Sequence, residues 1–113
     1  MQLVTAVVQP AKIEAVTEAL QDVGVRGMTV SSVSGMGRQR GHTETYRGAR
    51  IQTNTVDKVR IEILAHDEEL EGIIGAIVAA ARTGEIGDGK IWAVPLTDVV
   101  RVRTGERGPD AID

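Results

Sequence analysis

Apolar residues recur along the chain at the spacings of strands and helices. The clearest alternation spans residues 58–65, where Val59, Ile61 and Ile63 take one face of an expected strand and charged side chains take the other. Shorter apolar runs predict further strands, and apolar residues three or four positions apart predict two amphipathic helices. The expected strands are 3–8, 28–34, 58–65 and 91–96, and the expected helices are 13–23 and 70–81.

This order of elements, β-α-β-β-α-β, is that of the ferredoxin-like plait, an α+β fold with two helices on one face of an antiparallel sheet. The 113 residues suit a single domain, 1–113. The strands at 3–8 and 91–96 carry apolar residues at both odd and even positions, so apolar side chains also face the side that the helices leave open. Such a face predicts a homo-oligomer.

Two segments lack apolar periodicity. Residues 35–57 are rich in glycine and charge, and we expect a long loop without regular structure there. Loops of that length inside a small domain are generally functional or disordered. The chain from Thr104 onward is polar, and we expect it to be loose.

The composition argues against several classes of protein. A net charge of -3 lacks the basic excess of a nucleic-acid binder, and one Trp, one Tyr and no Phe are too few for the stacking sheet of an RNA-binding plait. Because there is no Cys and only two well-separated histidines, a dedicated metal site is not expected. No apolar run approaches ~20 residues, and the first residues do not resemble a signal peptide, so we expect a cytoplasmic protein without membrane insertion.

The turn from Gly84 to Lys90 matches most of a phosphate-binding loop, in which glycines expose main-chain N–H groups and a lysine adds charge. Ile91 stands where a nucleotide-hydrolysing P-loop has Ser or Thr, and the turn follows a helix rather than a strand. The sequence fits either a phosphate cradle or a plain helix-to-strand turn.

Three more cations are candidates for binding an anion. Arg101 and Arg103 would share one side of an extended segment, which suits a polyphosphate, although such a pair also fits a solvated surface. Lys58 begins the third strand, beside the long loop, and could pair with a ligand carboxylate or with a neighbouring side chain.

Three stretches together resemble the P-II (PII) family of nitrogen-regulatory signal-transduction proteins. They are Gly37-Arg38-Gln39-Arg40-Gly41-His42-Thr43-Glu44-Thr45-Tyr46-Arg47-Gly48, Thr83-Gly84-Glu85-Ile86-Gly87-Asp88-Gly89-Lys90-Ile91 and Arg101-Val102-Arg103-Thr104-Gly105-Glu106. The likeness runs without gaps from residue 1 to about 112, and the last residues are similar to actinobacterial members.

The resemblance implies a homotrimer with ATP or ADP in each cleft between subunits, and a signalling role rather than an enzymatic one. Residues 37–55 would form the T-loop, 82–90 the B-loop and 97–108 the C-loop. Mg²⁺ would reach the nucleotide through Gln39, and 2-oxoglutarate would be held by Gln39, Lys58 and the main chain near Gly41. A partner such as an ammonium transporter would contact the T-loop around Arg47. The resemblance also assigns nucleotide contacts to Thr29, Gly35, Gly37, Arg38, Glu62, Leu64, Gly87, Asp88, Gly89, Lys90, Arg101 and Arg103.

Two modification sites of the family are replaced in this sequence. Position 51, a modified tyrosine in many members, is Ile51, and position 49, a phosphorylated serine in some, is Ala49. We therefore expect control by ligands alone. The alternatives from other classes are a trimeric metal-tolerance protein of the CutA type and a slow nucleotide-hydrolysing enzyme.

Overall fold

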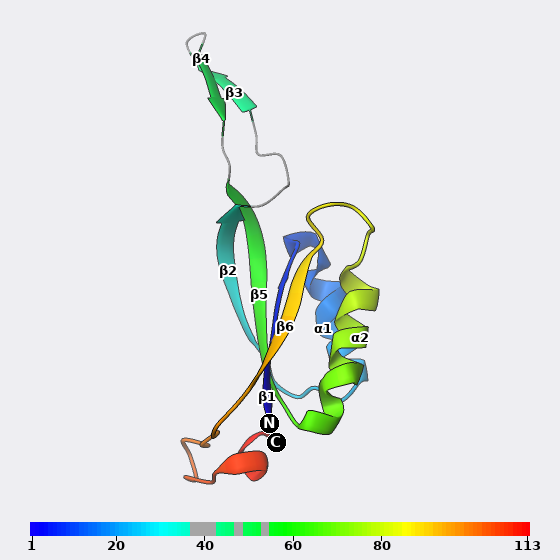
Figure 1. The fold of residues 1–113 in the computed structure, drawn as a ribbon, viewed down its shortest axis with the longest axis vertical. Helices are drawn as coiled ribbons and strands as arrows, with labels where there is room; N and C mark the ends of the chain where they lie inside the picture. The colour runs from blue at the N-terminus through cyan, green and yellow to red at the C-terminus, as the bar shows by residue number, and fades with distance from the viewer. Residues whose placement is uncertain (37–42, 47–48, 53–54) are drawn as a thin grey trace.

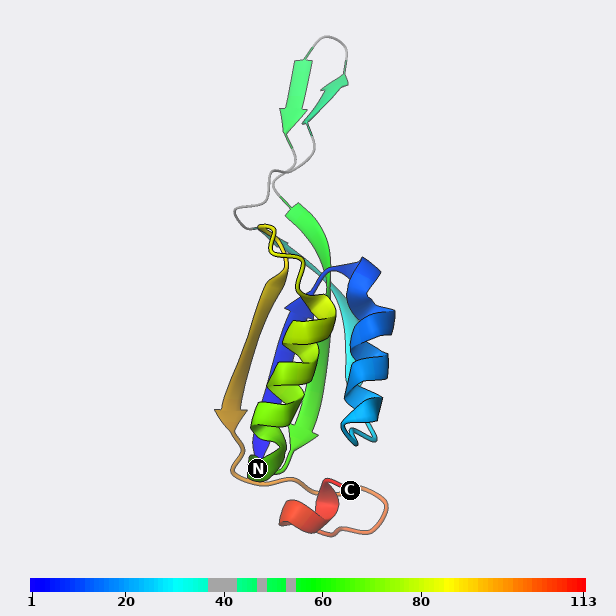
Figure 2. The same ribbon diagram turned by 90° about the vertical axis from the view of Figure 1, so that its right-hand side faces the viewer.

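The computed structural model describes residues 1–36, 43–46, 49–52 and 55–113, and for 43–46 and 49–52 it describes the main chain alone. Four strands form one antiparallel sheet in the order β2-β5-β1-β6, and two helices cover one of its faces (Figures 1 and 2). This arrangement confirms the ferredoxin-like plait expected from the pattern. The main elements are β1 Gln2–Val8, α1 Ile13–Asp22, β2 Thr29–Met36, β5 Thr55–Ala65, α2 Leu70–Ala81 and β6 Gly89–Pro95.

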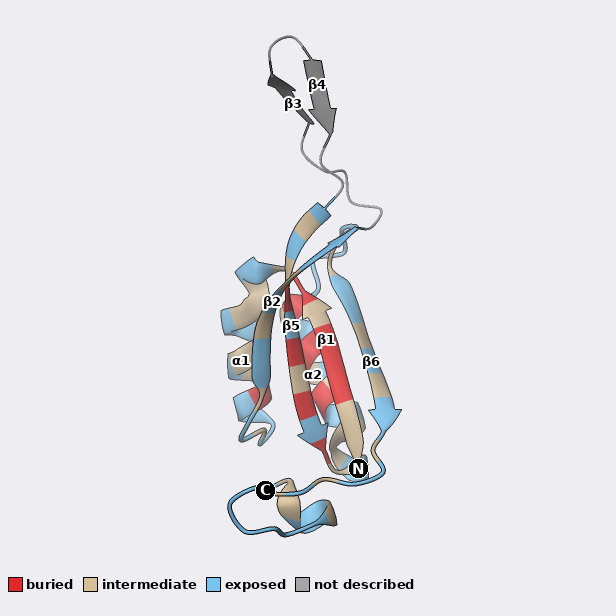
Figure 3. Ribbon diagram, turned by 90° about the vertical axis from the view of Figure 1, so that its left-hand side faces the viewer, coloured by how far each residue is buried: buried red, intermediate tan, exposed pale blue. Residues whose placement is uncertain are grey.

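The core lies between the sheet and the helices. Val4 and Ala6 on β1 and Ile61 on β5 are fully buried, and they meet Leu20 of α1 and Ile77 of α2. The central strands β1 and β5 carry most of the buried strand residues (Figure 3). Alternation along β5 is as predicted, because its buried residues all face the helices.

Helix α1 ends where the sequence indicated. Gly24 has φ of +92°, and the N–H of Val25 bonds the Leu20 carbonyl at 3.0 Å while the N–H of Gly24 bonds that of Gln21 at 3.0 Å. These two bonds form a Schellman cap, in which glycine takes the left-handed position at little cost.

The expectation of an unstructured loop at 35–57 was wrong for its described residues. β2 continues to Met36 and β5 begins at Thr55, and Gly35 pairs with Val56. Between them the chain forms a separate two-stranded sheet, β3 Thr43–Tyr46 and β4 Ala49–Gln52 (Figure 1). Main-chain pairing here does not need a buried face, so apolar periodicity gave no sign of it.

The expectation of a loose C-terminal segment was also wrong. Residues Gly108–Ala111 form a 3-10 helix, η3, and Val100 forms an isolated bridge with Arg107. The N–H of Gly108 bonds the Val99 carbonyl at 2.9 Å. The polar composition was misleading here, because the contacts that order this segment are made mainly by the main chain and by charged side chains.

The open face of the sheet is apolar toward the end where β1 begins and β6 ends. Leu3, Leu64 and Val94 lie in one row across three neighbouring strands, and Trp92 lies in the row of Thr5. Leu64, Trp92 and Val94 are each exposed by more than two fifths. This face has no cover within the described part of the chain, in agreement with the two-faced strands of the sequence.

Candidate functional site

A cavity of about 660 Å³, here called the upper cavity, opens where the turn before β6 faces the ends of β2 and β5. Five of the predicted site residues line it: Gly35, Lys58, Gly87, Gly89 and Lys90. The two lysines are its only charged lining residues among those described, and no carboxylate lines it. The upper cavity therefore suits an anion.

Lys58 joins the two walls of this cavity. Its Nζ donates a hydrogen bond of 2.5 Å to the main-chain oxygen of Gly87, 29 residues further along the chain. The charge at the start of β5 is thereby held beside the turn that precedes β6. The sequence had left open whether Lys58 faced a ligand or a neighbour; the structure places it at the cavity and in contact with the turn.

The turn itself is built around Asp88. The Asp88 carboxylate accepts hydrogen bonds from the main-chain N–H groups of Thr83 at 2.8 Å and Gly84 at 2.9 Å, and from the Thr83 hydroxyl at 2.5 Å. These bonds, first that of the Thr83 hydroxyl, lower the pKa of the Asp88 carboxyl. Gln9 braces the same turn by donating to the Gly87 carbonyl at 3.3 Å. Asp88 thus acts on the turn, and a direct contact with a ligand stays a prediction.

Glycine stands at positions 89 and 35 of the upper cavity for two different physical reasons. At Gly89 an added Cβ would lie 1.8 Å from the main-chain oxygen of Val7, and φ is +106°, so packing against β1 requires glycine. At Gly35 a Cβ would meet nothing within 4 Å. Packing therefore does not explain the glycine at 35, which leaves the wall of the upper cavity open.

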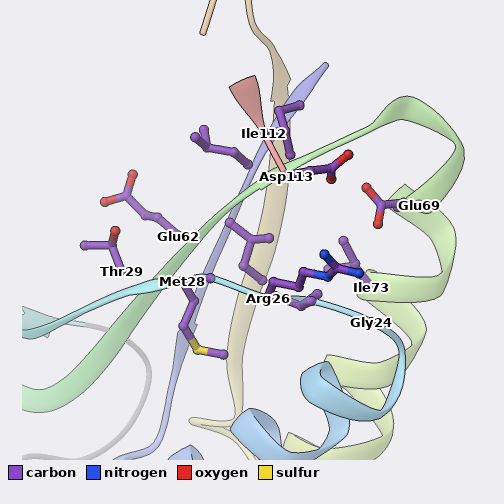
Figure 4. A pocket seen from close by; sticks show the side chains of 13 residues that line it. Gly24, Arg26, Met28, Thr29, Glu62, Glu69, Ile73, Ile112 and Asp113 are labelled. Carbon is purple, nitrogen blue, oxygen red and sulfur yellow. The ribbon is translucent and has the colours of Figure 1, made fainter. Parts of the chain in front are cut away.

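A second cavity of about 290 Å³, here called the lower cavity, lies beside the loop that follows α1. Thr29, Glu62 and Leu64, to which the resemblance assigned nucleotide contacts, all line it. Figure 4 shows Thr29 and Glu62 on its wall. Thr29 and Glu62 are direct partners in the pairing of β2 with β5, which brings a hydroxyl and a carboxylate together on one wall. Ile112 and Asp113 from the end of the described chain complete the rim.

The arginine pair does not have the extended geometry that alternation suggested. Residues 102–104 form a turn, so Arg101 and Arg103 do not share one side of a strand. Arg101 is three-quarters buried as a side chain and bonds Glu106 at 2.7 Å, whereas Arg103 is exposed. Both follow the last residue of β6, at the end of the sheet opposite the upper cavity (Figure 1).

The structure therefore divides the described residues of the predicted site into three groups in one chain. These are the upper cavity, the lower cavity and residues 101–104, here called the arginine turn. Gly37, Arg38, Gln39 and Gly41, and Arg47 as the expected partner contact, lie outside the described residues. Sequence reasoning missed five apolar or flexible residues of the upper cavity. These are Val7, Met36, Val56, Ile86 and Trp92, of which Val7 and Trp92 could have been found by following the odd and even positions of their strands.

Comparison with known proteins decides the family. Residues 1–106 match the family model described as nitrogen regulatory protein P-II. The chain belongs to the P-II family. Relatives named nitrogen regulatory protein P-II include one from Azospirillum brasilense, 50% identical over 112 residues, and one from Rhizobium meliloti, 49% identical over 112 residues; each alignment covers 99% of this chain and 100% of the relative.

A solved structure agrees with the family assignment. The crystal structure of Arabidopsis thaliana PII bound to citrate has a TM-score of 0.80 and 42% sequence identity, covering 98% of this chain and 88% of that chain. The resemblance drawn from the three motifs is thus confirmed, and the chain is a P-II nitrogen regulatory signalling protein. None of the described helices of this P-II protein is long and apolar enough to cross a membrane.

Proposed function

We propose that this P-II protein is a cytoplasmic sensor that binds ATP or ADP together with Mg²⁺ and 2-oxoglutarate, and that reports through its T-loop to partner proteins. The observation that carries the proposal is the upper cavity: two lysines, glycines and main-chain groups of a held turn, with no lining carboxylate among the described residues. Nucleotide phosphates need this combination of charge and close main-chain approach. The role proposed is regulatory rather than catalytic.

The division of the site argues that one nucleotide is shared between two copies of the chain. β6 has seven residues, so at ~3.3 Å per residue its ends are roughly 20 Å apart. Lys90 at one end and Arg101 beyond the other are therefore too far apart to hold the same phosphates in one subunit. A second copy, packed against the first, could bring its arginine turn to the upper cavity.

The open face of the sheet offers the contact for such copies. Leu64, Trp92 and Val94 expose apolar surface that association would remove from water. The family resemblance supplies the number of subunits. We propose a homotrimer with one nucleotide in each cleft between subunits. In it, Thr29 and Leu64 would lie near the adenine, and the lysines and arginines near the phosphates.

The upper cavity also supports a site for a small dicarboxylate. Lys58 is held there by Gly87 and could pair with one carboxylate of 2-oxoglutarate. Gln39 and Gly41, outside the described residues, are proposed to complete this site, with Gln39 also reaching the nucleotide's Mg²⁺. The structure of the Arabidopsis relative bound to citrate supports small carboxylates as ligands of such proteins.

Signalling would pass through the T-loop, which contains β3 and β4. We propose that a partner such as an ammonium transporter contacts the region of Arg47, and that ligands at the base of the T-loop change its preferred shape. Coupling of this kind is typically ~1–3 kcal/mol between two ligands. Because positions 49 and 51 are Ala49 and Ile51, we propose that ligands control this loop without covalent modification.

Calorimetry on the purified chain tests the proposal. ATP should bind, and 2-oxoglutarate should give appreciable heat only when Mg²⁺ and ATP are present. Gly35→Leu should lower ATP affinity at least tenfold without unfolding the chain, because its side chain would enter the open wall of the upper cavity.

Gly75→Leu is the matched control for this test, since Gly75 is exposed on α2 and a Cβ there also meets nothing within 4 Å. It should leave ATP binding unchanged. Binding of 2-oxoglutarate with equal affinity in the absence of nucleotide would contradict the proposal, as would a chain that ignores both ATP and ADP.

A further inference from the structure

The Arg101 guanidinium is engaged by its own chain. Its Nη1 donates to the Glu106 carboxylate at 2.7 Å, and its Nη2 donates to the main-chain oxygens of Asp110, at 3.0 Å, and of Asp113. All three acceptors belong to residues 106–113. A guanidinium so occupied has its fork directed at these acceptors rather than outward to a second anion.

The segment that makes these contacts is anchored at both ends. At its start, the N–H of Arg101 bonds the Glu106 carbonyl at 2.9 Å and the N–H of Gly108 bonds the Val99 carbonyl at 2.9 Å. At its end, the Asp113 carboxylate meets His66 Nε2 at 3.1 Å. The segment therefore forms a closed loop around Arg101, and η3 lies within it.

The same segment reaches the lower cavity. Ile112 and Asp113 line it (Figure 4). Thr29 and Leu64, proposed above to lie near the adenine, line the same cavity. One stretch of eight residues thus contacts a cation expected to bind phosphate and also borders the space expected to hold the base. Both contacts are made within one chain.

We propose that the segment Glu106–Asp113 is a latch that competes with the nucleotide for Arg101. This inference rests on the proposed nucleotide site, and it adds a way in which binding at that site is regulated. In the latched chain Arg101 is bound to Glu106 and to two main-chain oxygens; nucleotide binding requires Arg101 to exchange them for phosphate oxygens. Only chains with an open latch can bind, so the apparent affinity for nucleotide falls in proportion to the fraction of chains in which the latch is open.

The side-chain part of the latch can be removed by one isosteric change. Glu106→Gln keeps the shape of residue 106 and removes the charge that faces Arg101. Calorimetry with ATP should show about two- to five-fold tighter binding for Glu106→Gln than for the unchanged chain, the range expected for a partly exposed ion pair.

Two comparisons make this result specific. Glu18→Gln removes one negative charge from an exposed position on α1, far from Arg101 in the sequence, and should leave the affinity unchanged. In a chain that already carries Arg101→Gln, adding Glu106→Gln should have no effect, because the cation for which the two ligands compete is gone.

Hydrogen exchange gives a second readout, in which ligand binding should speed the exchange of some amides rather than slow it. A bound ligand normally slows exchange around its site, whereas release of the latch should speed exchange of the Gly108 and Ile112 amides, which bond Val99 and Pro109 in the latched chain. ATP should therefore accelerate these two amides while it protects the turn 83–89.

The outcomes separate the latch from the nucleotide site. If the unchanged chain binds ATP and Glu106→Gln binds equally or more weakly, the latch is wrong and the proposed function stands. If neither chain binds ATP, both are wrong. If both chains bind ATP and Glu106→Gln binds more tightly, the latch and the proposed function are both supported.

Discussion

The two ends of β6 differ in how their cations are placed. At its start, Lys90 borders the upper cavity, beside a turn whose shape is set by Asp88 and by glycine. Beyond its end, Arg101 is bonded to Glu106 and to main-chain oxygens of its own chain. If both ends take phosphate as proposed, the first already presents its cation to a cavity, whereas the second must first give up its contacts within the chain. Most of the regulation should then lie at the arginine end.

The largest expected effect is a loss of stability when Gly89, at the start of β6, is replaced. Gly89→Ala places a Cβ 1.8 Å from the Val7 main-chain oxygen at a φ of +106°, so β6 must move away from β1. We expect a loss of about 3 kcal/mol or more in the free energy of unfolding, measured by denaturant titration.

Gly84→Ala is the control for that prediction. Gly84 also has positive φ, +89°, but a Cβ there meets nothing within 4 Å, so only the conformational cost of about 1–2 kcal/mol remains. Equal losses for the two variants would show that the approach of Gly89 to Val7 does not matter.

The next effect concerns the association that would bring the two ends together. Val94 lies on the open face of the sheet and is 44% exposed, while Val78 on α2 is 41% exposed on the other side of the molecule. Val94→Asp should convert trimers to smaller species at micromolar concentration in sedimentation equilibrium, because a charge would be buried at the interface. Val78→Asp should not. Unchanged association of Val94→Asp would exclude this face as the contact.

The third effect tests the Asp88 carboxylate as the acceptor that holds the turn. Asp88→Ala removes the acceptor that holds Thr83 and Gly84, and ATP affinity should fall roughly tenfold as the turn loses its fixed form. The pKa of the Asp88 carboxyl is lowered in the folded chain, chiefly by the Thr83 hydroxyl. Its stabilising contribution is therefore fully present above the ordinary value of 3.8 and is lost as pH falls through the lower folded value.

Nuclear magnetic resonance can follow that loss through the amide of Thr83. Its signal should shift as Asp88 is protonated in acid, and the shift should be absent in Asp88→Ala. A Thr83 amide that does not respond to pH below 4 would contradict the role given to this carboxylate.

The sequence predicted the fold because the spacing of apolar residues along β5 and α1 matches the residues that are buried. Val59, Ile61 and Ile63 lie where period two placed them, and Gly24 ends its helix for a local reason that can be read from the chain. It did not predict the hairpin of β3 and β4, whose strands are short and whose pairing is set by the main chain.

In the candidate site, the glycines and lysines singled out in the sequence lie together at one cavity, whereas the sequence did not indicate which groups contact Arg101. The turn at 84–90 and Lys58 were singled out as candidates from their glycines and cations, and the structure brings residues of both to the upper cavity. The occupation of Arg101 could not be predicted, because Glu106 and Asp113 come close to it only through the fold of η3. A segment that looks polar and free in the sequence can thus be held by ionic contacts with its own chain.

The smallest effect concerns the far anchor of the latch. The hydrogen bond with Asp113 is the main cause that raises the pKa of His66, and the charges of Asp113, Glu69 and Glu68 add to it. The protonated histidine therefore stabilises this contact fully below its ordinary value of 6.5, and the contribution is lost as pH rises through the raised folded value. A proton titration of the His66 ring should show a midpoint above 6.5 in the unchanged chain, and Asp113→Asn should move it down. A midpoint that ignores Asp113→Asn would mean that the contact at 3.1 Å does not hold the segment in solution, and the arginine end would then be anchored by Glu106 and η3 alone.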